Sequence, residues 1–192
     1  MMSTMTIQGD VGTSTASGLD ALDEVRVVHT VVPSPLGPIT LVAHDGGLSA
    51  LLLPSSKYEA AQGPFGERAD DEFDHVREQL DEYFAGTRTE FDLPLHFVGT
   101  TFQCRVWEGL LRIPFGQTRS YGDLAAEIGL DPRTSSRAVG AANGRNRIAI
   151  VVPCHRVIGA DGSLTGFAAG LDAKRFLLGL EAKGRPREHL LF

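Results

Sequence analysis

The chain has 192 residues, which is enough for one large domain or two small ones whose cores need no disulfide or metal. Its two cysteines, Cys104 and Cys154, lie on unlike segments, no signal peptide precedes them, and no apolar run approaches the roughly 18 residues of a membrane span. We therefore expect a reduced, cytoplasmic protein. The formal charge of −6 is unevenly distributed, because residues 1–99 carry 5 basic and 16 acidic residues and residues 100–192 carry 13 and 8. Because the second half is basic, the overall negative charge does not exclude nucleic acid as a partner.

The first half predicts a small α+β domain. Residues 1–24 are mostly small and polar without a period, so we expect a disordered tail. Strands are predicted over residues 25–32, 39–43 and 48–53, a loop over 54–71, a helix over 73–84 that Gly86 ends, and a short strand over 91–97. Because no cysteine, paired histidine or phosphate-binding loop gives residues 25–97 a chemistry, we assign them a supporting role.

The second half predicts a mainly helical domain that starts near residue 98. Thr100 is placed to cap a first helix with a strong apolar stripe. Ser120-Tyr121-Gly122-Asp123 has the pattern of a capping box, and Gly129 closes the short helix that follows it. A further helix, rich in small residues, is predicted over 134–143. Two short helices across a tight turn indicate a helix-turn-helix.

The stretch around this second short helix is basic. Between Asp131 and Asp161 there is no acidic residue, and the stretch contains Arg133, Arg137, Arg145, Arg147 and Arg156. This pattern fits a phosphate-facing patch, and a solvated basic face explains it equally well. Small side chains would let the helix backbone approach a groove closely, and the helix lacks the Asn, Gln and Lys set that reads base edges, which favours the minor groove. Packing against a neighbouring helix explains the same small residues.

A cysteine follows the most apolar run of the chain. Residues 148–152 predict a strand that is buried on both faces, and Pro153 ends it because proline cannot donate to a ladder. Cys154 would then lie where a buried strand stops. A thiol reacts as its thiolate, and the imidazole of His155 and a cation such as Arg156 are groups that lower a thiol pKa. A buried cysteine that serves only as a small hydrophobe is the alternative.

A last helix is predicted from about Asp172. Its core-facing apolar residues are Phe176, Leu177 and Leu180. Glu181 follows Leu177 by four residues and so points towards the buried side, where a carboxylate needs a partner. His155 is the candidate partner, which makes Cys154, His155 and Glu181 a thiol, a base and an orienting acid. Adjacent residues of an extended segment point to opposite faces, so His155 would reach Cys154 through a turn or a water.

These motifs resemble those of the O6-alkylguanine-DNA alkyltransferases. The resemblance rests on Val152-Pro153-Cys154-His155-Arg156-Val157, Arg137-Ala138-Val139-Gly140, Asn146, Glu181, residues 102–107 and Ser120-Tyr121. It is specific over residues 102–181, looser over 25–97, where Ser34-Pro35-Leu36-Gly37 fits the family's first domain, and absent over 1–24. It implies an α+β fold in which a small ribonuclease H-like domain precedes a helix-turn-helix domain, similar to a winged helix, over residues 98–192.

The resemblance also implies a role for each matching residue. Cys154 resembles the acceptor of the alkyl group, His155 the water-bridged base and Glu181 the acid that holds its imidazole. Asn146 would brace the turn at the acceptor, and Tyr121 would donate to the departing guanine. The implied DNA contacts come from Thr134, Ser135, Arg137, Ala138, Ala142, Arg145 and Arg147, with Arg137 as the finger that fills the gap left by a flipped nucleotide. The implied guanine contacts come from Tyr121, Phe167, Ala168 and the carbonyls near Cys154 and Val157.

The implied function is DNA repair by direct reversal. An alkyl group would pass from O6-alkylguanine, and from O4-alkylthymine, in double-stranded DNA to Cys154 after the base is flipped from the minor-groove side. The resulting thioether has no easy leaving path, so the protein would act once. No cofactor is implied, and no metal is expected, because no cysteine precedes Cys104 and no Cys/His set has zinc spacing. We expect a monomer in the absence of DNA.

Three residues depart from the family's pattern. Phe167 stands where the family more often has Tyr, Ala169 where Gly is usual, and Arg147 where Pro commonly follows the Asn. Loss of a hydroxyl and addition of a methyl group beside the pocket would narrow the range of alkyl groups accepted. The acceptor cysteine is retained, which distinguishes the chain from the family's alkyltransferase-like relatives.

Two other functions fit the same residues. A DNA-binding regulator would sense alkylation through Cys154 and would bind a specific operator in its unmodified form. A Cys-His-Glu hydrolase would turn over an ester or amide repeatedly.

Overall fold

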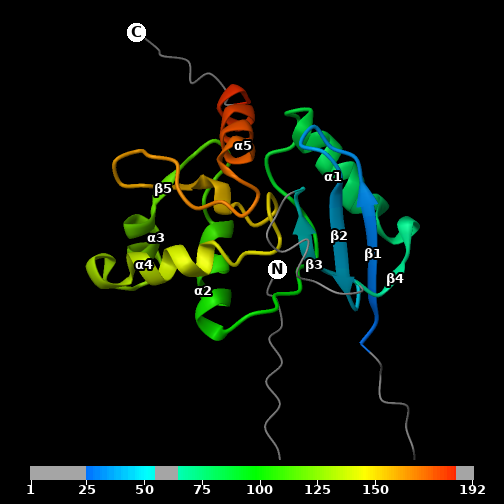
Figure 1. Ribbon diagram of the computed structural model, residues 1–192, viewed down its shortest axis with the longest axis horizontal. Coiled ribbons are helices and arrows are strands. Elements are labelled where there is room, and N and C mark those ends of the chain that lie inside the picture. The colour runs from blue at the N-terminus through cyan, green and yellow to red at the C-terminus, as the bar shows by residue number, and fades with distance from the viewer. Residues whose placement is uncertain (1–24, 55–64, 185–192) are drawn as a thin grey trace, which may run out of the picture.

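The computed structural model describes residues 25–54 and 65–184, so the predicted tail over 1–24 lies outside the described residues (Figure 1). The first part, here called the sheet domain, has a four-stranded sheet of order β3-β2-β1-β4. Its strands are β1 (Val27–Val32), β2 (Ile39–His44), β3 (Gly47–Leu52) and β4 (Glu67–Arg68). The three strands that the sequence predicts are present and pair as antiparallel neighbours, whereas the two-residue β4 lies within the expected loop and pairs parallel to β1.

The β2–β3 hairpin and the following helix form for local reasons. Asp45 and Gly46 have φ values of 46° and 79°, the left-handed conformation that a two-residue hairpin turn requires. A 3-10 turn, η1 (Asp70–Phe73), leads into α1 (Asp74–Phe84), which buries Val76, Leu80 and Tyr83. These side chains belong to the same core as the sheet residues Val28, Leu41 and Leu51. The second face of the sheet is covered in part, since Val42, Ala50 and Leu52 pack with Phe65. Both faces of β2 are therefore buried.

The strand predicted over residues 91–97 is wrong. This segment has a single bridge to the sheet, between Leu95 and Leu48. The N–H of Leu48 donates to the carbonyl of Pro94, at 2.8 Å, and the N–H of His96 donates to the carbonyl of Leu48, at 2.9 Å. Pro94 has no N–H, so the ladder cannot extend through it. The segment meets the edge of β3 in this one parallel bridge and does not become a fifth strand.

The second part, here called the helical domain, contains α2 (Thr101–Leu111), α3 (Tyr121–Glu127), α4 (Pro132–Asn143) and α5 (Leu171–Lys183), with η2 (Cys154–Arg156) and the short parallel pair β5 (Arg119–Ser120) and β6 (Val157–Ile158). Thr100 caps α2, as predicted, and Ser120 caps α3 through the predicted capping box. The Thr100 cap is also a capping box, with Gln103, and Asp131 caps α4. The helices α3 and α4 lie side by side as the predicted helix-turn-helix pair (Figure 1). The predicted mixed α+β class is confirmed.

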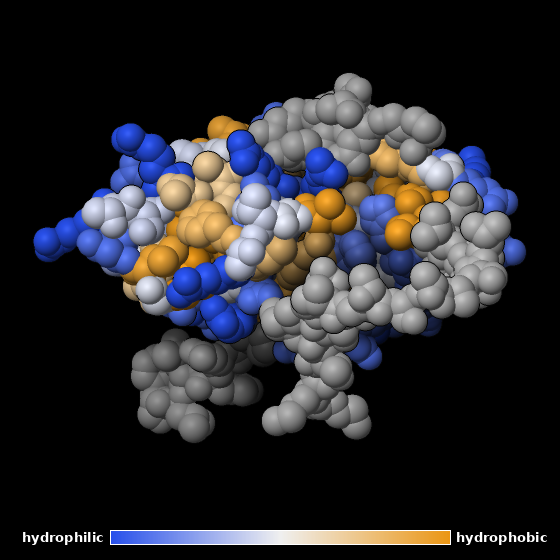
Figure 2. All heavy atoms as spheres, turned by 90° about the horizontal axis from the view of Figure 1, so that it is seen from below, coloured by the Kyte–Doolittle hydropathy of each residue, from blue (hydrophilic) through white to orange (hydrophobic). Residues whose placement is uncertain are grey.

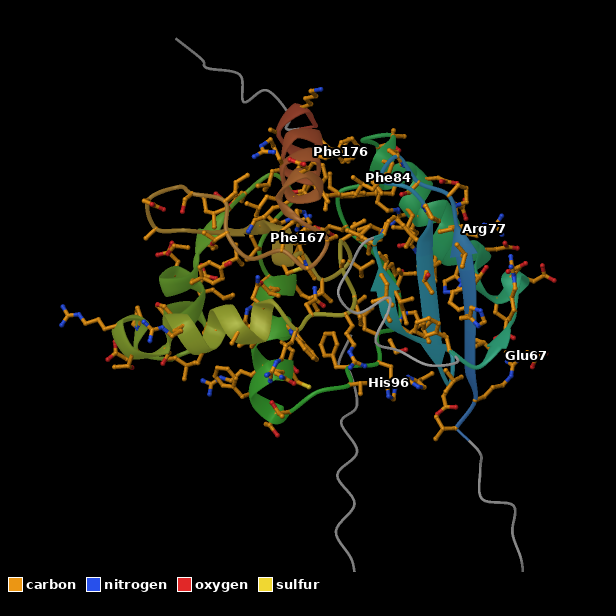
Figure 3. All side chains as sticks on the ribbon, viewed as in Figure 1. Glu67, Arg77, Phe84, His96, Phe167 and Phe176 are labelled. Carbon is orange, nitrogen blue, oxygen red and sulfur yellow. The ribbon has the colours of Figure 1, made fainter. Side chains whose placement is uncertain are left out.

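The two domains share one apolar core. Leu110 of α2 and Val152 belong to the same buried cluster as Leu41 and Leu51 of the sheet. On α5, Leu177 is fully buried and Leu180 half-buried, but Phe176 is 40% exposed, so its predicted place in the core is wrong. Phe176 and Phe84 project from α5 and α1 on the same side of the molecule (Figure 3). No described helix is long and apolar enough to cross a bilayer.

Candidate active site

The segment before the cysteine is a turn and not the predicted strand. Asn146 holds it from both ends: its Oδ1 accepts from the N–H of Ile148 at 2.9 Å, and its Nδ2 donates to the carbonyl of Val152 at 2.8 Å. Ile150 has a φ of 70°, a left-handed conformation that is strained for a β-branched residue. The apolar run is largely buried, as predicted, but a side-chain amide holds its two ends, and it meets the neighbouring strand β3 in a single bridge instead of a ladder. We call residues 146–152 the Asn146 turn.

The Asn146 turn is attached to the sheet domain. The N–H of Leu51 in β3 donates to the carbonyl of Arg147 at 2.8 Å, and the N–H of Ala149 donates to the carbonyl of Leu51 at 3.2 Å. These two hydrogen bonds frame a bridge between Leu51 and Ile148. The position of the turn is therefore set by both domains.

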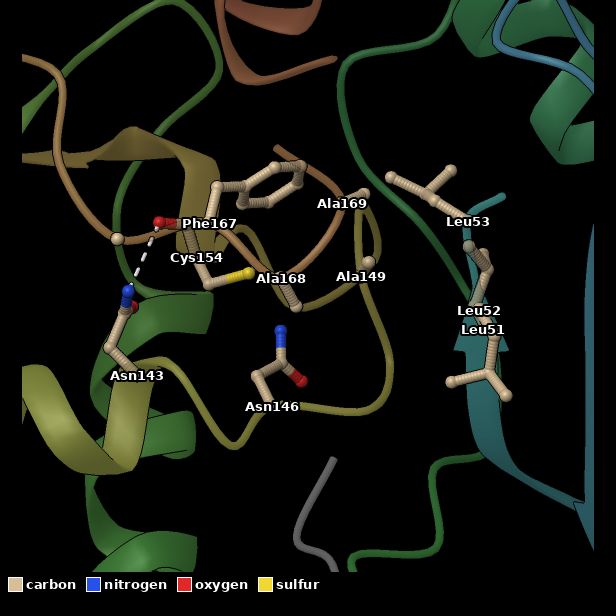
Figure 4. Close-up of a pocket in the computed structure, with 11 residues that line it drawn as sticks. Leu51, Leu52, Leu53, Asn143, Asn146, Ala149, Cys154, Phe167, Ala168 and Ala169 are labelled. Carbon is tan, nitrogen blue, oxygen red and sulfur yellow. Dashed lines mark hydrogen bonds between the residues drawn. The ribbon is translucent and has the colours of Figure 1, made fainter. Parts of the chain in front are cut away.

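Cys154 begins η2 and lines a pocket at this junction. Leu51 and Leu52 at the end of β3, and Leu53 directly after it, line one side of the pocket (Figure 4). Asn143, Asn146 and the loop over residues 166–169 line the rest. Figure 4 shows the Cys154 thiol directed between the Phe167 ring and the amide of Asn146. Phe167 and Ala168, two of the expected guanine contacts, therefore line the same pocket as the thiol, and so does Ala169.

The thiol is held in its neutral form by its surroundings. Burial raises the pKa of Cys154, and a hydrogen bond with Asn146 and the positive charge of Lys174 oppose that rise without cancelling it. The sequence suggests Arg156 as a cation that lowers the Cys154 pKa, and this prediction is wrong. Its guanidinium is buried, binds Glu181 and donates to the carbonyl of Ile113 at 2.6 Å. The thiolate must therefore form when a base accepts the proton.

Glu181 is fully buried and accepts hydrogen bonds from several directions. His155 Nε2 lies 2.7 Å from Oε1, which confirms the predicted pairing. The other donors are Arg156 Nε at 2.9 Å, the Gly116 N–H at 2.9 Å and the Tyr83 hydroxyl at 2.8 Å. Burial raises the pKa of Glu181, but the hydrogen bonds and charges of His155 and Arg156 outweigh it and bring the pKa to about 2. Glu181 is therefore a carboxylate at neutral pH.

His155 is a buried base with one nitrogen occupied. Its Nε2 is taken by Glu181, and among the described residues its buried Nδ1 has no hydrogen-bond partner. Burial lowers the pKa of His155 more than the Glu181 carboxylate raises it, and the charges of Arg156 and Lys174 lower it further. The imidazole is accordingly neutral near pH 7, with Nδ1 able to accept a proton.

Reasoning from the sequence misses Lys174 of α5. Its ammonium is fully buried and donates to the carbonyls of Val157 and Thr165, each at 2.6 Å. These bonds link the strand that follows η2 to the loop that forms the pocket wall. Burial lowers the pKa of Lys174 to about 8 although the Cys154 thiolate would raise it. The signal is present in the sequence, because residues 174, 177 and 181 share one helix face.

The expected guanine contacts are only partly brought together. The hydroxyl of Tyr121 donates to the carbonyl of Thr165 at 3.3 Å and lies beside Gly166, which lines the pocket. The side chain of Val157 is fully buried, and its carbonyl already accepts from Lys174, so a guanine there would share that oxygen. The carbonyl of Cys154 lies 3.5 Å from Nδ2 of Asn143.

The expected DNA contacts lie mainly on the exposed side of α4. Thr134, Arg137, Ala138 and Arg145 are exposed, and Ser135 and Arg147 are half-buried. Ala142 is buried and its carbonyl accepts from the Trp107 indole at 3.0 Å, so among the expected contacts it is the one that is not exposed even in part, and its contact with DNA stays a prediction. Arg156 is likewise absent from the surface patch. Figure 2 shows hydrophilic side chains projecting from the end of the molecule that α3 and α4 form.

The described residues contain no group of three His, Cys, Asp or Glu side chains that is placed to hold a metal ion. The polar side chains that line the pocket are the Cys154 thiol and the amides of Asn143 and Asn146. The His155–Glu181 pair follows the thiol in the interior, and the Lys174 ammonium group is close enough to lower the thiol pKa. This arrangement suits nucleophilic attack by sulfur with proton transfer to a neutral imidazole.

Known proteins share both domains. The ribonuclease-like domain of 6-O-methylguanine DNA methyltransferase matches residues 27–97, and its DNA binding domain matches residues 101–183. The methylated-DNA-protein-cysteine methyltransferase of Mycobacterium tuberculosis is 47% identical over 164 residues, which cover 85% of this chain and 98% of the relative. The protein of the same description from Methanosarcina acetivorans is 47% identical over 153 residues, which cover 80% and 97%.

The solved structures agree with the sequences. The crystal structure of Mycobacterium tuberculosis OGT in complex with DNA has a TM-score of 0.77 and 47% sequence identity, and the match covers 83% of this chain and 95% of that chain. A crystal structure of the Mycobacterium tuberculosis O6-methylguanine methyltransferase matches with a TM-score of 0.75 and 45% identity over 84% of this chain and 96% of that chain. On this evidence the chain belongs to the 6-O-methylguanine DNA methyltransferase family.

Proposed function

We propose that the chain repairs alkylated DNA by transferring the alkyl group of O6-alkylguanine to Cys154. The observation that carries the proposal is the position of the thiol. Cys154 faces a pocket between the Asn146 turn and the loop over 166–169, and it adjoins the buried His155–Glu181 pair. The relatives are named for a cysteine methyltransferase that acts on methylated DNA, and the match covers nearly all of their length.

The proposed reaction needs a displacement, a proton transfer before it and a proton transfer after it. His155 takes the proton of the Cys154 thiol through a water, and the sulfur then attacks the alkyl carbon in line with the carbon–oxygen bond. That bond breaks, a carbon–sulfur bond forms, and guanine leaves with the electron pair and takes a proton from the Tyr121 hydroxyl. The proton that His155 accepted then returns through solvent to Tyr121, so that both side chains end in their starting forms. The product thioether is not reversed, so each molecule acts once, without a cofactor.

The finer parts of the proposal concern recognition. Residues 98–192 bind DNA and accept the alkyl group, and residues 25–97 support them. Arg137 enters from the minor groove and replaces the flipped base, while Arg145 and Arg147 contact phosphates together with the start of α4. O4-alkylthymine is a second substrate. The free protein is a monomer in the cytoplasm, where thiols stay reduced.

The first experiment is mass analysis after mixing with a duplex oligonucleotide that carries one O6-methylguanine. We expect one methyl group on the peptide containing Cys154, with saturation at one equivalent. Cys154→Ala should gain none while still binding DNA, and Cys104→Ala, the matched cysteine control, should gain as much as the unchanged protein. Transfer by Cys154→Ala would refute the proposal. Binding without any mass gain would favour the regulator, and turnover beyond one equivalent would favour the hydrolase.

A second experiment tests the intruding arginine. Arg137→Ala should slow repair of duplex DNA at least about tenfold and should leave the reaction with free O6-methylguanine unchanged, because only the duplex requires base extrusion. Arg175→Ala, which removes an exposed arginine from α5, is the control and should slow neither reaction. Equal slowing of both reactions by Arg137→Ala would mean that Arg137 acts through the fold.

A further inference from the structure

A polar group of the sheet domain reaches the candidate active site. Tyr83 lies on α1 and is fully buried. Its hydroxyl donates to Oε1 of Glu181 at 2.8 Å, across 98 positions of the sequence. Neither the apolar stripe of α1 nor the motifs that carry the family resemblance single this residue out.

We propose that Tyr83 is a positioning residue for the alkyl transfer, which acts from the sheet domain through Glu181 on the proton-accepting His155. The proposal rests on the proposed function of Cys154. It differs from that function in assigning part of the reaction chemistry to the domain that otherwise only supports the pocket.

The geometry of the carboxylate carries the argument. His155 and Tyr83 share the same oxygen, Oε1, at 2.7 and 2.8 Å. Arg156 donates to both oxygens, and the N–H of Gly116 donates to Oε2. Burial, and then the charge of Glu181, raise the pKa of Tyr83, so the phenol keeps its proton and serves as a donor. Each donor to Oε1 withdraws negative charge from the oxygen that faces His155.

The consequence falls on the base. Burial lowers the pKa of His155, the Glu181 carboxylate raises it, and the charges of Arg156 and Lys174 lower it. The Cys154 thiol, a further titratable group, is its neighbour in the chain. By sharing Oε1, the Tyr83 hydroxyl weakens the one interaction that favours a second proton on the imidazole. Tyr83 thereby helps to keep His155 neutral and ready to accept the thiol proton.

Packing alone is the competing explanation for Tyr83. Its ring lies 5.5 Å from Phe84, 5.5 Å from Phe91 and 6.0 Å from Phe115, between ring centroids. Tyr83→Phe preserves the ring and removes only the hydroxyl, so the two explanations separate. Val76→Ala is the matched control, because Val76 is buried on the same helix and its side chain cannot form a hydrogen bond with Glu181.

Two measurements on the full chain test the proposal. The first is the NMR signal of the His155 ring protons and its titration in the free protein. We expect Tyr83→Phe to strengthen the His155–Glu181 hydrogen bond and to raise the His155 pKa by about half a unit to one unit. The second is the pH dependence of methyl transfer, whose acidic limb should move to higher pH by the same amount. Val76→Ala should lower thermal stability and move neither.

The outcomes separate the two proposals. An active wild-type protein whose His155 titration and pH profile are unchanged by Tyr83→Phe would overturn the role of Tyr83 alone. A wild-type protein that transfers no methyl group would overturn the proposed function, and the role of Tyr83 with it, whatever the NMR signal shows. If Tyr83→Phe and Val76→Ala shift the His155 pKa and the pH profile equally, Tyr83 contributes only through packing.

Discussion

The sheet domain and the helical domain bury different kinds of polar group. In the described part of the sheet domain, the buried polar side chains apart from Tyr83 are the hydroxyl residues Thr30, Thr40 and Ser49. Its ion pairs lie at the surface, as between Arg26 and Glu72. The described part of the helical domain buries Asn143, Asn146, His155, Arg156, Lys174 and Glu181.

This difference indicates that the helical domain buries polar groups at a cost in stability because they serve a reaction. The sheet domain shows that this chain can build a core without buried charge. Ionic groups are costly to bury unless they are paired and hydrogen-bonded, so a cluster of them beside a thiol points to a reactive site rather than to a stabilising device. Tyr83 is the point at which the sheet domain takes part in that cluster.

The largest expected effect is on stability, and it comes from comparing a buried carboxylate with an exposed one. Glu181→Gln leaves Arg156 and His155 without an anion in the core and should cost about 3–5 kcal/mol of unfolding free energy. Glu72→Gln makes the same chemical change at the surface and should leave Tm nearly unchanged. Thermal and denaturant unfolding of the two variants provide the comparison. Equal losses would show that burial does not distinguish the two domains.

The same pair of variants predicts a difference in acid. The pKa of Glu181 is about 2 in the fold against 4.5 for a free Glu, so its contribution to stability is present above about pH 4.5 and is lost as the pH falls towards 2. Glu181→Gln should remove that part of the acid dependence. A variant whose stability still falls as steeply as the wild type over this range would assign the acid dependence to other carboxylates.

A smaller effect is expected from the buried ammonium group. Lys174→Met removes the cation that lowers the Cys154 pKa, so the thiol pKa should rise by about one unit and alkylation by iodoacetamide near pH 7 should slow about tenfold. Lys183→Met changes an exposed lysine on the same helix and serves as the control. Peptide mass analysis separates Cys154 from Cys104. If the alkylation rate of Cys154 is the same in Lys174→Met as in the wild type, Lys174 is only a structural link between Val157 and Thr165.

The smallest effect is expected where the two domains meet. Ala169→Gly removes a methyl group from the pocket, so it should raise the rate with O6-benzylguanine relative to O6-methylguanine a few-fold, with little change in Tm. Leu53→Ala alters the opposite side of the pocket but lies in the shared core, so it should mainly lower Tm. Competition between the two bases measures the ratio. A ratio that Ala169→Gly does not change would show that Ala169 does not limit the pocket.

Local patterns predict much of the fold. The capping residues Thr100 and Ser120 and the apolar stripes indicate the helices, because those signals act within a few residues. The same logic fails over 148–152, since a buried turn and a buried strand have the same hydrophobic pattern. What decides between them is the side chain of Asn146, which satisfies both ends of the turn.

The site is predictable from the sequence only in part. The His155–Glu181 pair follows from the need of a core-facing carboxylate for a partner, and the structure has it. The sequence groups Arg156 with the basic surface residues, because local patterns do not reveal the partners that bury it. One of these partners, the carbonyl of Ile113, lies 43 positions away. Tyr83 looks like an apolar member of the α1 stripe for the same reason. Contacts between distant segments depend on how the domains dock, which composition and periodicity do not encode.

The bonds between β3 and the Asn146 turn also bear on solubility. β3 is an edge strand of the sheet, and its open side is taken by His96 and Pro94 at Leu48 and by Arg147 and Ala149 at Leu51. An apolar edge strand with free N–H and carbonyl groups is a template for pairing with another molecule. Residues 25–97 separated from the helical domain would lose the cover at Leu51. The docking of the two domains therefore protects this protein from self-association as well as shaping its pocket.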